Sequence, residues 1–184
     1  MPKRLDQIIV VDIESTCWEG SPPPGEVSEI IEVGICPVEL STGRRLGKRS
    51  ILVCPKRSHV SAFCTQLTTL TLEQVNGGIT FMEACEVLQR EYKSRERVWA
   101  SFGDYDRTMF QKQCQATGVP YPFGPRHINV KTLFAISRGL PQEIGTAEAM
   151  GLMSVSFEGT HHRGDDDAWN VARILGVLVQ RLRA

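Results

Sequence analysis

Two carboxylates, Asp12 and Glu14, end a run of β-branched residues near the start of the chain. The run, residues 8–11, is almost free of polar atoms and is typical of a buried central strand. Because a strand points residues i and i+2 to the same face, we expect both carboxylates to lie side by side. Two like charges that close repel each other and resist desolvation, and a bound cation relieves both effects. The pair therefore predicts a metal site.

Three later segments, residues 103–106, 161–162 and 165–167, add carboxylate and imidazole groups. They follow predicted strands or begin predicted helices, which is where α/β folds place their sites. Oxygen ligands dominate, and the six Cys are scattered without a zinc-like spacing, so a hard cation, Mg²⁺ or Mn²⁺, is favoured. Mg²⁺ held by a few carboxylates keeps positions open for water and phosphate, which indicates phosphoryl-transfer chemistry.

The elements that must position these groups can be read from hydrophobic periodicity and turn residues. Strands are predicted at residues 8–14, 29–36, 50–54, 98–102 and 128–130. Helices are predicted from residue 71, with Thr80 as an N-cap and Glu83 completing a capping box, and at residues 106–115, 131–137, 146–150 and about 165–183. Short turns join the first three strands into an antiparallel meander, and the later interleaved helices predict an α/β sheet of mixed order.

Length and composition narrow the class of protein. The chain of 184 residues is of a size for one domain, which we assign to residues 1–184. The 21 Lys plus Arg balance the 21 Asp plus Glu, so a polyanion must be met locally, by metal or by a small basic patch. No apolar stretch reaches a membrane span, no signal peptide precedes the first strand, and the cysteines favour a reduced state. We therefore expect a cytoplasmic protein that does not enter a membrane.

The ordered motifs resemble those of the DEDDh 3′-to-5′ exonucleases, a superfamily that includes RNase T and the proofreading subunit of polymerases. The segment 12–16, Asp-Ile-Glu-Ser-Thr, is similar to their first motif. Their third motif, a His, four residues and an Asp, is matched from His162 to Asp167. Their middle motif, an Asp at a helix start after an aromatic residue, is matched by Asp106 after Tyr105.

Three segments narrow the resemblance to the Eri-type branch of exoribonucleases: residues 10–17, 29–34 and 63–68. Enzymes of that branch trim the 3′ ends of RNA in eukaryotes and have bacterial relatives. The resemblance covers about residues 8 to 180. It implies an RNase H-like α/β fold with a mixed sheet of about five strands flanked by helices.

The resemblance also implies roles for individual residues. Catalysis would involve Asp12, Glu14, Asp106, His162 and Asp167, and the four acids among them would hold two ions of Mg²⁺ or Mn²⁺ per active site. His162 would take the proton of the attacking water at neutral pH. The terminal nucleotide would be bound by Ile13, Phe63, Leu67, Thr68 and Tyr105.

Two of these assignments have competitors nearby. Asp104 competes with Asp106, and the aromatic and apolar neighbours of Asp106 favour the latter. His161 competes with His162 because each stands five residues before an aspartate, and the Ala that follows the second aspartate favours His162.

We therefore expect a metal-dependent 3′-to-5′ exonuclease that acts on RNA or short single-stranded oligonucleotides and releases nucleoside 5′-monophosphates. Its partner would be a single-stranded nucleic acid 3′ end, with RNA favoured, and no obligate protein partner is inferred. One alternative is a DNA-directed exonuclease of the same chemistry. The other is an idle nucleic-acid-binding domain, against which stands the full set of five candidate groups.

Overall fold

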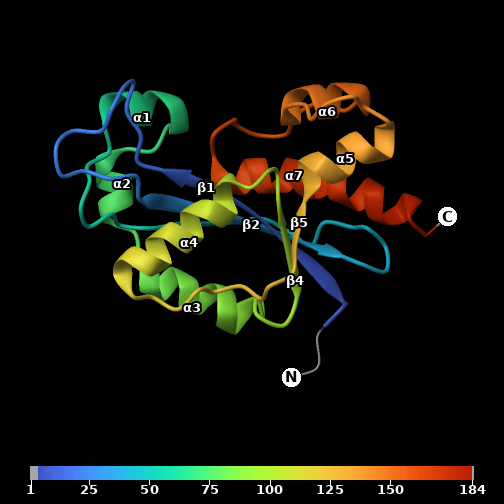
Figure 1. Ribbon diagram of the computed structural model, residues 1–184, viewed down its shortest axis with the longest axis horizontal. Coiled ribbons are helices and arrows are strands. Elements are labelled where there is room, and N and C mark those ends of the chain that lie inside the picture. The colour runs from blue at the N-terminus through green and yellow to red at the C-terminus, as the bar shows by residue number, and fades with distance from the viewer. Residues whose placement is uncertain (1–3, 184) are drawn as a thin grey trace.

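A five-stranded sheet forms the centre of the computed structural model, which describes residues 4–183 (Figure 1). Its strand order is β3-β2-β1-β4-β5. The first three strands pair antiparallel, whereas β4 is parallel to both β1 and β5. The strands are β1 Gln7–Ser15, β2 Ile30–Glu39, β3 Arg49–Leu52, β4 Val98–Ser101 and β5 His127–Asn129. The mixed sheet and its antiparallel meander confirm the predicted fold class.

Helices cover both faces of the sheet. In Figure 1, α3 and α4 lie on one side of the strands and α5, α6 and α7 on the other, with α1 and α2 at one end. The helices are α1 Ala62–Thr68, α2 Leu72–Asn76, α3 Phe81–Glu91, α4 Tyr105–Thr117, α5 Val130–Arg138, α6 Thr146–Leu152 and α7 Gly164–Arg181. Within residues 4–183, none of them has the length and apolar composition needed to cross a bilayer.

The central strand β1 explains why residues 8–11 are apolar without alternation. Ile9 and Val11 pack into the layer of α3 and α4, whereas Ile8 and Val10 pack into the layer of α5 and α7. Because both faces of β1 are covered by helices, each successive side chain is buried. Asp12 and Glu14 therefore follow at the point where the strand leaves the core.

Local structure departs from the predicted elements in two places. Residues 62–68, where neither a helix nor a strand is predicted, form α1, because Ser61 caps the helix by accepting a hydrogen bond from the N–H of Cys64. Val130, expected at the end of a strand, instead begins α5, where the side chain of Asn129 accepts from the N–H of Thr132. In both places a side-chain cap sets where the helix begins; α1 was missed altogether, whereas α5 matches the predicted helix 131–137 except for its first residue and its last.

The start of α7 lies directly on β2. A Cβ atom added to Gly34 would be 1.8 Å from the carbonyl carbon of Gly164, so neither strand nor helix has room for a larger residue at Gly34. Gly34 is paired with Asp12 across the sheet. This close approach brings the first turn of α7 beside the acidic end of β1.

Candidate active site

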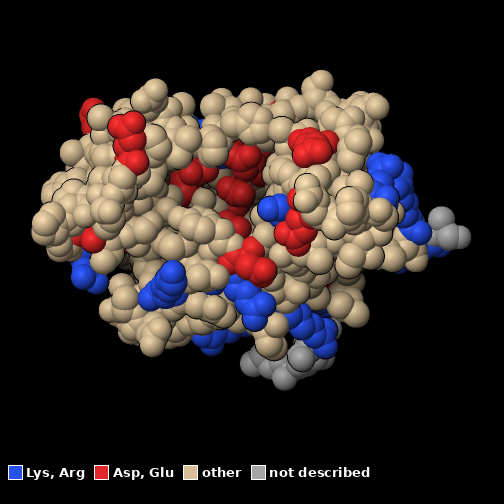
Figure 2. Space-filling view, turned by 45° about the horizontal axis from the view of Figure 1, so that its top comes forward, with Lys and Arg blue, Asp and Glu red and all other residues tan. Residues whose placement is uncertain are grey.

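A cavity of about 360 Å³ opens at the carboxyl end of β1. Figure 2 shows acidic side chains gathered in a hollow in the middle of that face of the molecule. Elements far apart in the sequence supply its walls. The lining residues are Asp12, Ile13, Glu14, Ser15, Cys17, Leu67, Phe102, Tyr105, Asp106, Thr146, His162 and Asp167.

The two carboxylates of β1 share this cavity, as the strand period predicts. Burial, followed by the neighbouring carboxylates, raises the pKa of Asp12 well above its ordinary value. Burial and the charges of Asp167 and Glu32 raise the pKa of Glu14 to about 8. Both side chains therefore lack enough positive charge around them to remain ionised easily at neutral pH.

Asp106 approaches β1 from α4, of which it is the second residue. Its Oδ1 accepts a hydrogen bond of 2.9 Å from the backbone N–H of Ile13. Burial nevertheless raises the pKa of Asp106 to about 7. Its competitor Asp104 stands just before the helix, where its exposed carboxylate accepts from the side chain of Asn129. Of the two aspartates, Asp106 is therefore the one that lines the cavity.

Asp167 belongs to the first turn of α7 and completes an acidic triad with the β1 pair. One oxygen from each of Asp12, Glu14 and Asp167 lies within 4.8 Å of the other two. Asp167 Oδ2 is buried, and within residues 4–183 it has no hydrogen-bond partner. Burial raises the pKa of Asp167 above its ordinary value.

The two histidines before α7 have different surroundings. His162 lines the cavity and has a left-handed backbone, with a φ of 60°. His161 stacks on Phe157 with ring centroids 3.7 Å apart, and its Nδ1 is 3.7 Å from Asp167 Oδ1. His162 therefore lines the space that a substrate would enter, whereas His161 is held against Phe157 and does not line the cavity.

Three of the five residues expected to contact the nucleotide line the cavity: Ile13, Leu67 and Tyr105. The Tyr105 hydroxyl is 2.8 Å from Ser15 Oγ, which fixes its position over the end of β1. Phe63 lies in an adjoining cavity of about 530 Å³ that shares Leu67 as a wall. Thr68 departs from the expectation: it is fully buried in α1, and its hydroxyl donates to the carbonyl of Cys64.

Four lining residues were not anticipated from the sequence: Ser15, Cys17, Phe102 and Thr146. Phe102 follows β4, so the strand-end argument used for the acids could have found it. Ser15 and Cys17 directly continue the acidic strand. Thr146 begins α6, and no local pattern shows where that helix packs.

The donor set fits a hard divalent cation. Three carboxylate oxygens converge, one buried oxygen has no partner within residues 4–183, and the pKa values of all three acids are raised. Carboxylate oxygens are ligands that Mg²⁺ and Mn²⁺ prefer. A cation would replace the missing positive charge, so Asp12, Glu14 and Asp167 could hold one, with Asp106 beside them.

A family model described as an exonuclease matches residues 9–175. This chain belongs to the exonuclease family. Membership implies divalent metal ions at the site, in agreement with the convergent carboxylates.

Relatives of this exonuclease include animal enzymes. The 3′-5′ exonuclease Snipper of Drosophila melanogaster is 27% identical, covering 94% of this chain and 69% of its own length. The human 3′-5′ exoribonuclease 1 is 29% identical, covering 95% of this chain and 53% of its own length. The exonuclease thus spans about half the length of the human relative.

Among solved structures, the nuclease domain of 3′hExo, described as a DEDDh family member bound to rAMP, superimposes with a TM-score of 0.86. It is 26% identical, and the match covers 98% of this exonuclease and 95% of that domain. These similarities confirm the RNase H-like fold and the resemblance to Eri-type DEDDh exonucleases.

Proposed function

We propose that this protein is a metal-dependent 3′-to-5′ exoribonuclease. One observation carries the proposal: the three convergent carboxylates and His162 share one cavity with the apolar and aromatic walls formed by Leu67 and Tyr105. The names of the relatives support the same reaction. The substrate would be the 3′ end of a single-stranded RNA, and the product a nucleoside 5′-monophosphate.

The acids of this chain would bind Mg²⁺ or Mn²⁺, and we propose two ions per site. Bound there, the ions would supply Lewis-acid stabilisation of the attacking and leaving oxygens. Asp12, Glu14 and Asp167 would hold metal through oxygens that already converge. Asp106 would contribute as the fourth acid, and the hydrogen bond from Ile13 N–H orients its carboxylate in advance.

His162 would act as the general base. It lines the cavity, and imidazole is the side chain that most often serves as a general base at neutral pH. Ile13 lies between Asp12 and Glu14 at the cavity, and its backbone would contact the terminal nucleotide, because its side chain is only 4% exposed and packs in the core. Leu67 and Tyr105 would pack against the terminal nucleotide from the other walls, with Phe63 beside Leu67.

The test is degradation of 5′-labelled single-stranded RNA and DNA of equal sequence, in Mn²⁺, Mg²⁺ or EDTA, with Asp12→Ala as the control. We expect a one-nucleotide ladder from the 3′ end that requires metal and Asp12 and forms faster on RNA. A faster ladder on DNA would assign a DNA-directed exonuclease. Binding without any ladder would contradict the proposal and indicate an idle binding domain.

Alanine substitution of each histidine tests the choice of base. We expect His162→Ala to lower kcat by about 10² to 10⁴, the usual contribution of general base catalysis. His161→Ala, which removes the ring stacked on Phe157, should retain most of kcat. A greater loss in His161→Ala would transfer the role of base to His161.

A further inference from the structure

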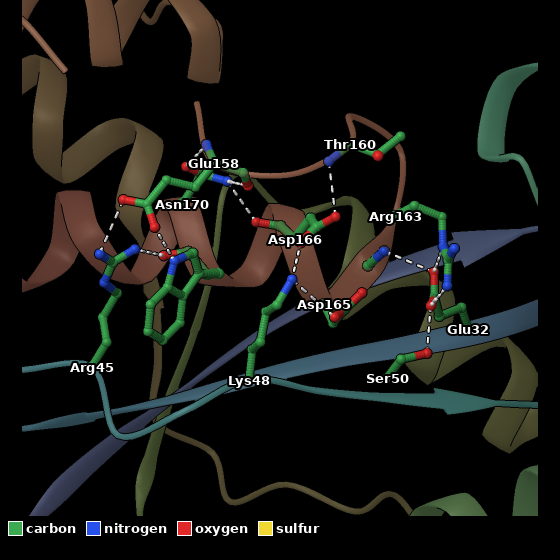
Figure 3. Close-up of polar contacts among 12 residues, drawn as sticks. Glu32, Arg45, Lys48, Ser50, Glu158, Thr160, Arg163, Asp165, Asp166 and Asn170 are labelled. Carbon is green, nitrogen blue, oxygen red and sulfur yellow. Dashed lines mark hydrogen bonds and ion pairs between the residues drawn. The ribbon is translucent and has the colours of Figure 1, made fainter. Parts of the chain in front are cut away.

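The segment that carries His162 is fixed at both ends by carboxylates outside the cavity (Figure 3). Before the histidines, the N–H of Thr160 donates to Asp166 Oδ2 over 2.8 Å. After them, the N–H of Gly164 donates to Glu32 Oε2, also over 2.8 Å. Only residues 161–163 lie between these two attachment points, so the attachments restrict where His162 can be.

Glu32 is the stronger attachment, because each of its two carboxylate oxygens accepts from two donors, whereas each oxygen of Asp166 accepts from one. It is completely buried on β2, and besides Gly164 it accepts from the guanidinium of Arg163, with Nη2 at 3.0 Å, and from Ser50 Oγ at 2.5 Å. A buried carboxylate is stable only when it is paired and hydrogen-bonded in this way. Glu32 is also the residue opposite Glu14 in the sheet, so it joins the loop directly to the acidic strand.

Asp166 forms the other attachment. It is an ion-pair partner of Lys48, whose ammonium also lies 3.3 Å from Asp165. The carboxylate of Asp166 fills the turn at Gly159, where an added Cβ would be 2.2 Å from Asp166 Cγ. Gly159 has a φ of 97°, a conformation that favours glycine, and its lack of a side chain leaves room for the Asp166 carboxylate in this turn.

Both attachments are formed with residues of the β2–β3 hairpin. Lys48 directly precedes β3, and Ser50 lies within it, so the β2–β3 hairpin contacts both ends of the histidine segment (Figure 3). The segment needs such support, because a non-glycine residue in the left-handed region is strained and persists only where its surroundings fix it. His162 is such a residue, with a φ of 60°.

We infer that Glu32 and Lys48 are positioning residues for His162: the β2–β3 hairpin holds the segment in the one conformation that points this ring into the cavity. The inference rests on the proposed function, in which His162 is the base. Neither residue lines the cavity. Lys48 pairs with Asp165 and Asp166 and acts on the reaction through the segment that Asp166 holds, whereas the charge of Glu32 also raises the pKa of Glu14 and so reaches the cavity acids directly.

The experiment compares Glu32→Gln and Lys48→Met with Arg49→Met. Arg49 is a matched control: it is the next cation of the same hairpin, but its guanidinium pairs with Glu91, 2.6 Å away. Steady-state kinetics on single-stranded RNA with Mn²⁺ should show kcat about ten- to a hundredfold lower in Glu32→Gln and Lys48→Met, because a misplacement near 1 Å has effects of that size. KM should change little, and Arg49→Met should match the unsubstituted protein.

The decisive readout is the same pair of substitutions in the His162→Ala background. Lys48→Met has nothing left to position there, so we expect it to cause no further loss of kcat, and Glu32→Gln should lower kcat less than it does in the unsubstituted protein. A loss that adds in full would overturn the inference and assign Glu32 and Lys48 to general stability. Unchanged kcat in both single variants would overturn it as well.

Amide hydrogen exchange provides a readout that does not depend on activity. Exchange at residues 160–164 should quicken in Glu32→Gln and Lys48→Met but not in Arg49→Met. Equal exchange in all variants would contradict the inference even if the protein hydrolysed no RNA, whereas a lack of hydrolysis by the unsubstituted protein would contradict only the proposed function. If Glu32→Gln fails to fold, Lys48→Met, whose side chain is 38% exposed, still decides the question.

Discussion

Two groups of acidic side chains meet at the start of α7, and they have opposite electrostatic surroundings. Glu32, Asp165 and Asp166 face the β2–β3 hairpin and are paired with Lys48 or Arg163 (Figure 3). The acids of the cavity converge on one another, and their nearest ion-pair partner is the imidazole of His161, 3.7 Å from Asp167. The first group is neutralised by the protein, and the second needs a cation from solution.

The consecutive residues Asp166 and Asp167 show most clearly how the surroundings of the two groups differ. Burial alone would raise the pKa of Asp166, but the Lys48 ammonium and the Thr160 N–H outweigh the effect of burial, and the pKa lies below its ordinary value. Burial raises the pKa of Asp167, and no comparable cation opposes it. One turn of helix thus places a structural carboxylate and a candidate metal ligand side by side, and the difference lies in their partners rather than in residue type.

The largest expected effect comes from removing a charge from the cavity group. Asp167→Asn should lower the rate of RNA hydrolysis by about a thousandfold, the scale on which loss of one group that stabilises transition-state charge is felt. Asp104→Asn is the control, because its carboxylate is exposed and bound to Asn129. Initial rates in saturating Mn²⁺ measure both variants. Comparable rates in the two would show that the cavity group has no special role.

Metal should stabilise the protein more as pH rises. Burial raises the pKa of Glu14 from 4.5 to about 8 and that of Asp106 from 3.8 to about 7. Below about pH 4 both groups are protonated in either state and have no effect on stability. Between there and pH 8 the unfolded chain releases protons that the folded protein keeps, so the metal-free protein should lose stability across this window.

Divalent cations bind the deprotonated folded form and oppose that loss. At a concentration 100-fold above Kd, Mn²⁺ should add about 2.7 kcal/mol to the free energy of unfolding, or about 5 to 10 °C in Tm. Thermal unfolding at pH 6 and pH 8, with EDTA or Mn²⁺, measures the effect, and Asp12→Asn should reduce it. A Tm at pH 8 that is the same with EDTA and with Mn²⁺ would contradict a metal site.

The smallest expected effect is on the free energy of unfolding, which should change in opposite directions when Asp166 and Asp167 are replaced. Asp166→Asn should lower the free energy of unfolding by about 1 kcal/mol, because it breaks a partly exposed charge-assisted pair with Lys48. Asp167→Asn should raise it in EDTA, because it removes a buried charge from among other acids. Urea unfolding in EDTA measures both, and destabilisation by both substitutions would remove the distinction between the groups.

The sequence predicts those features that depend on local periodicity. The shared face of Asp12 and Glu14 follows from the period of a strand, and the capping box of Thr80 and Glu83 is present as predicted at the start of α3. Gly118, with a φ of 71°, ends α4 close to the end of the helix predicted at residues 106–115. In each case a few neighbouring residues determine the geometry, so no knowledge of distant parts of the chain is needed.

Features that depend on distant partners were not predicted from periodicity. The position of residues 165–167 at a predicted helix start made them candidates for the site, but only the family resemblance selected Asp167, which lies 152 positions after Ser15 at the end of β1. The burial of Glu32 depends on Arg163, 131 positions away. A charged residue inside a β-branched strand was the available signal, because a buried carboxylate requires a partner somewhere. The sequence could not say where that partner lies.

The contact between Gly34 and Gly164 sets a distance that matters for chemistry. Backbone rests on backbone there, with the carbonyl oxygen of Asp12 only 3.2 Å from where a Cβ on Gly164 would be. The gap between the strand that carries Asp12 and the helix that carries Asp167 is therefore as narrow as two main chains allow. Discrimination between ions of different radius would then depend on two residues that have no side chain and never touch the ion.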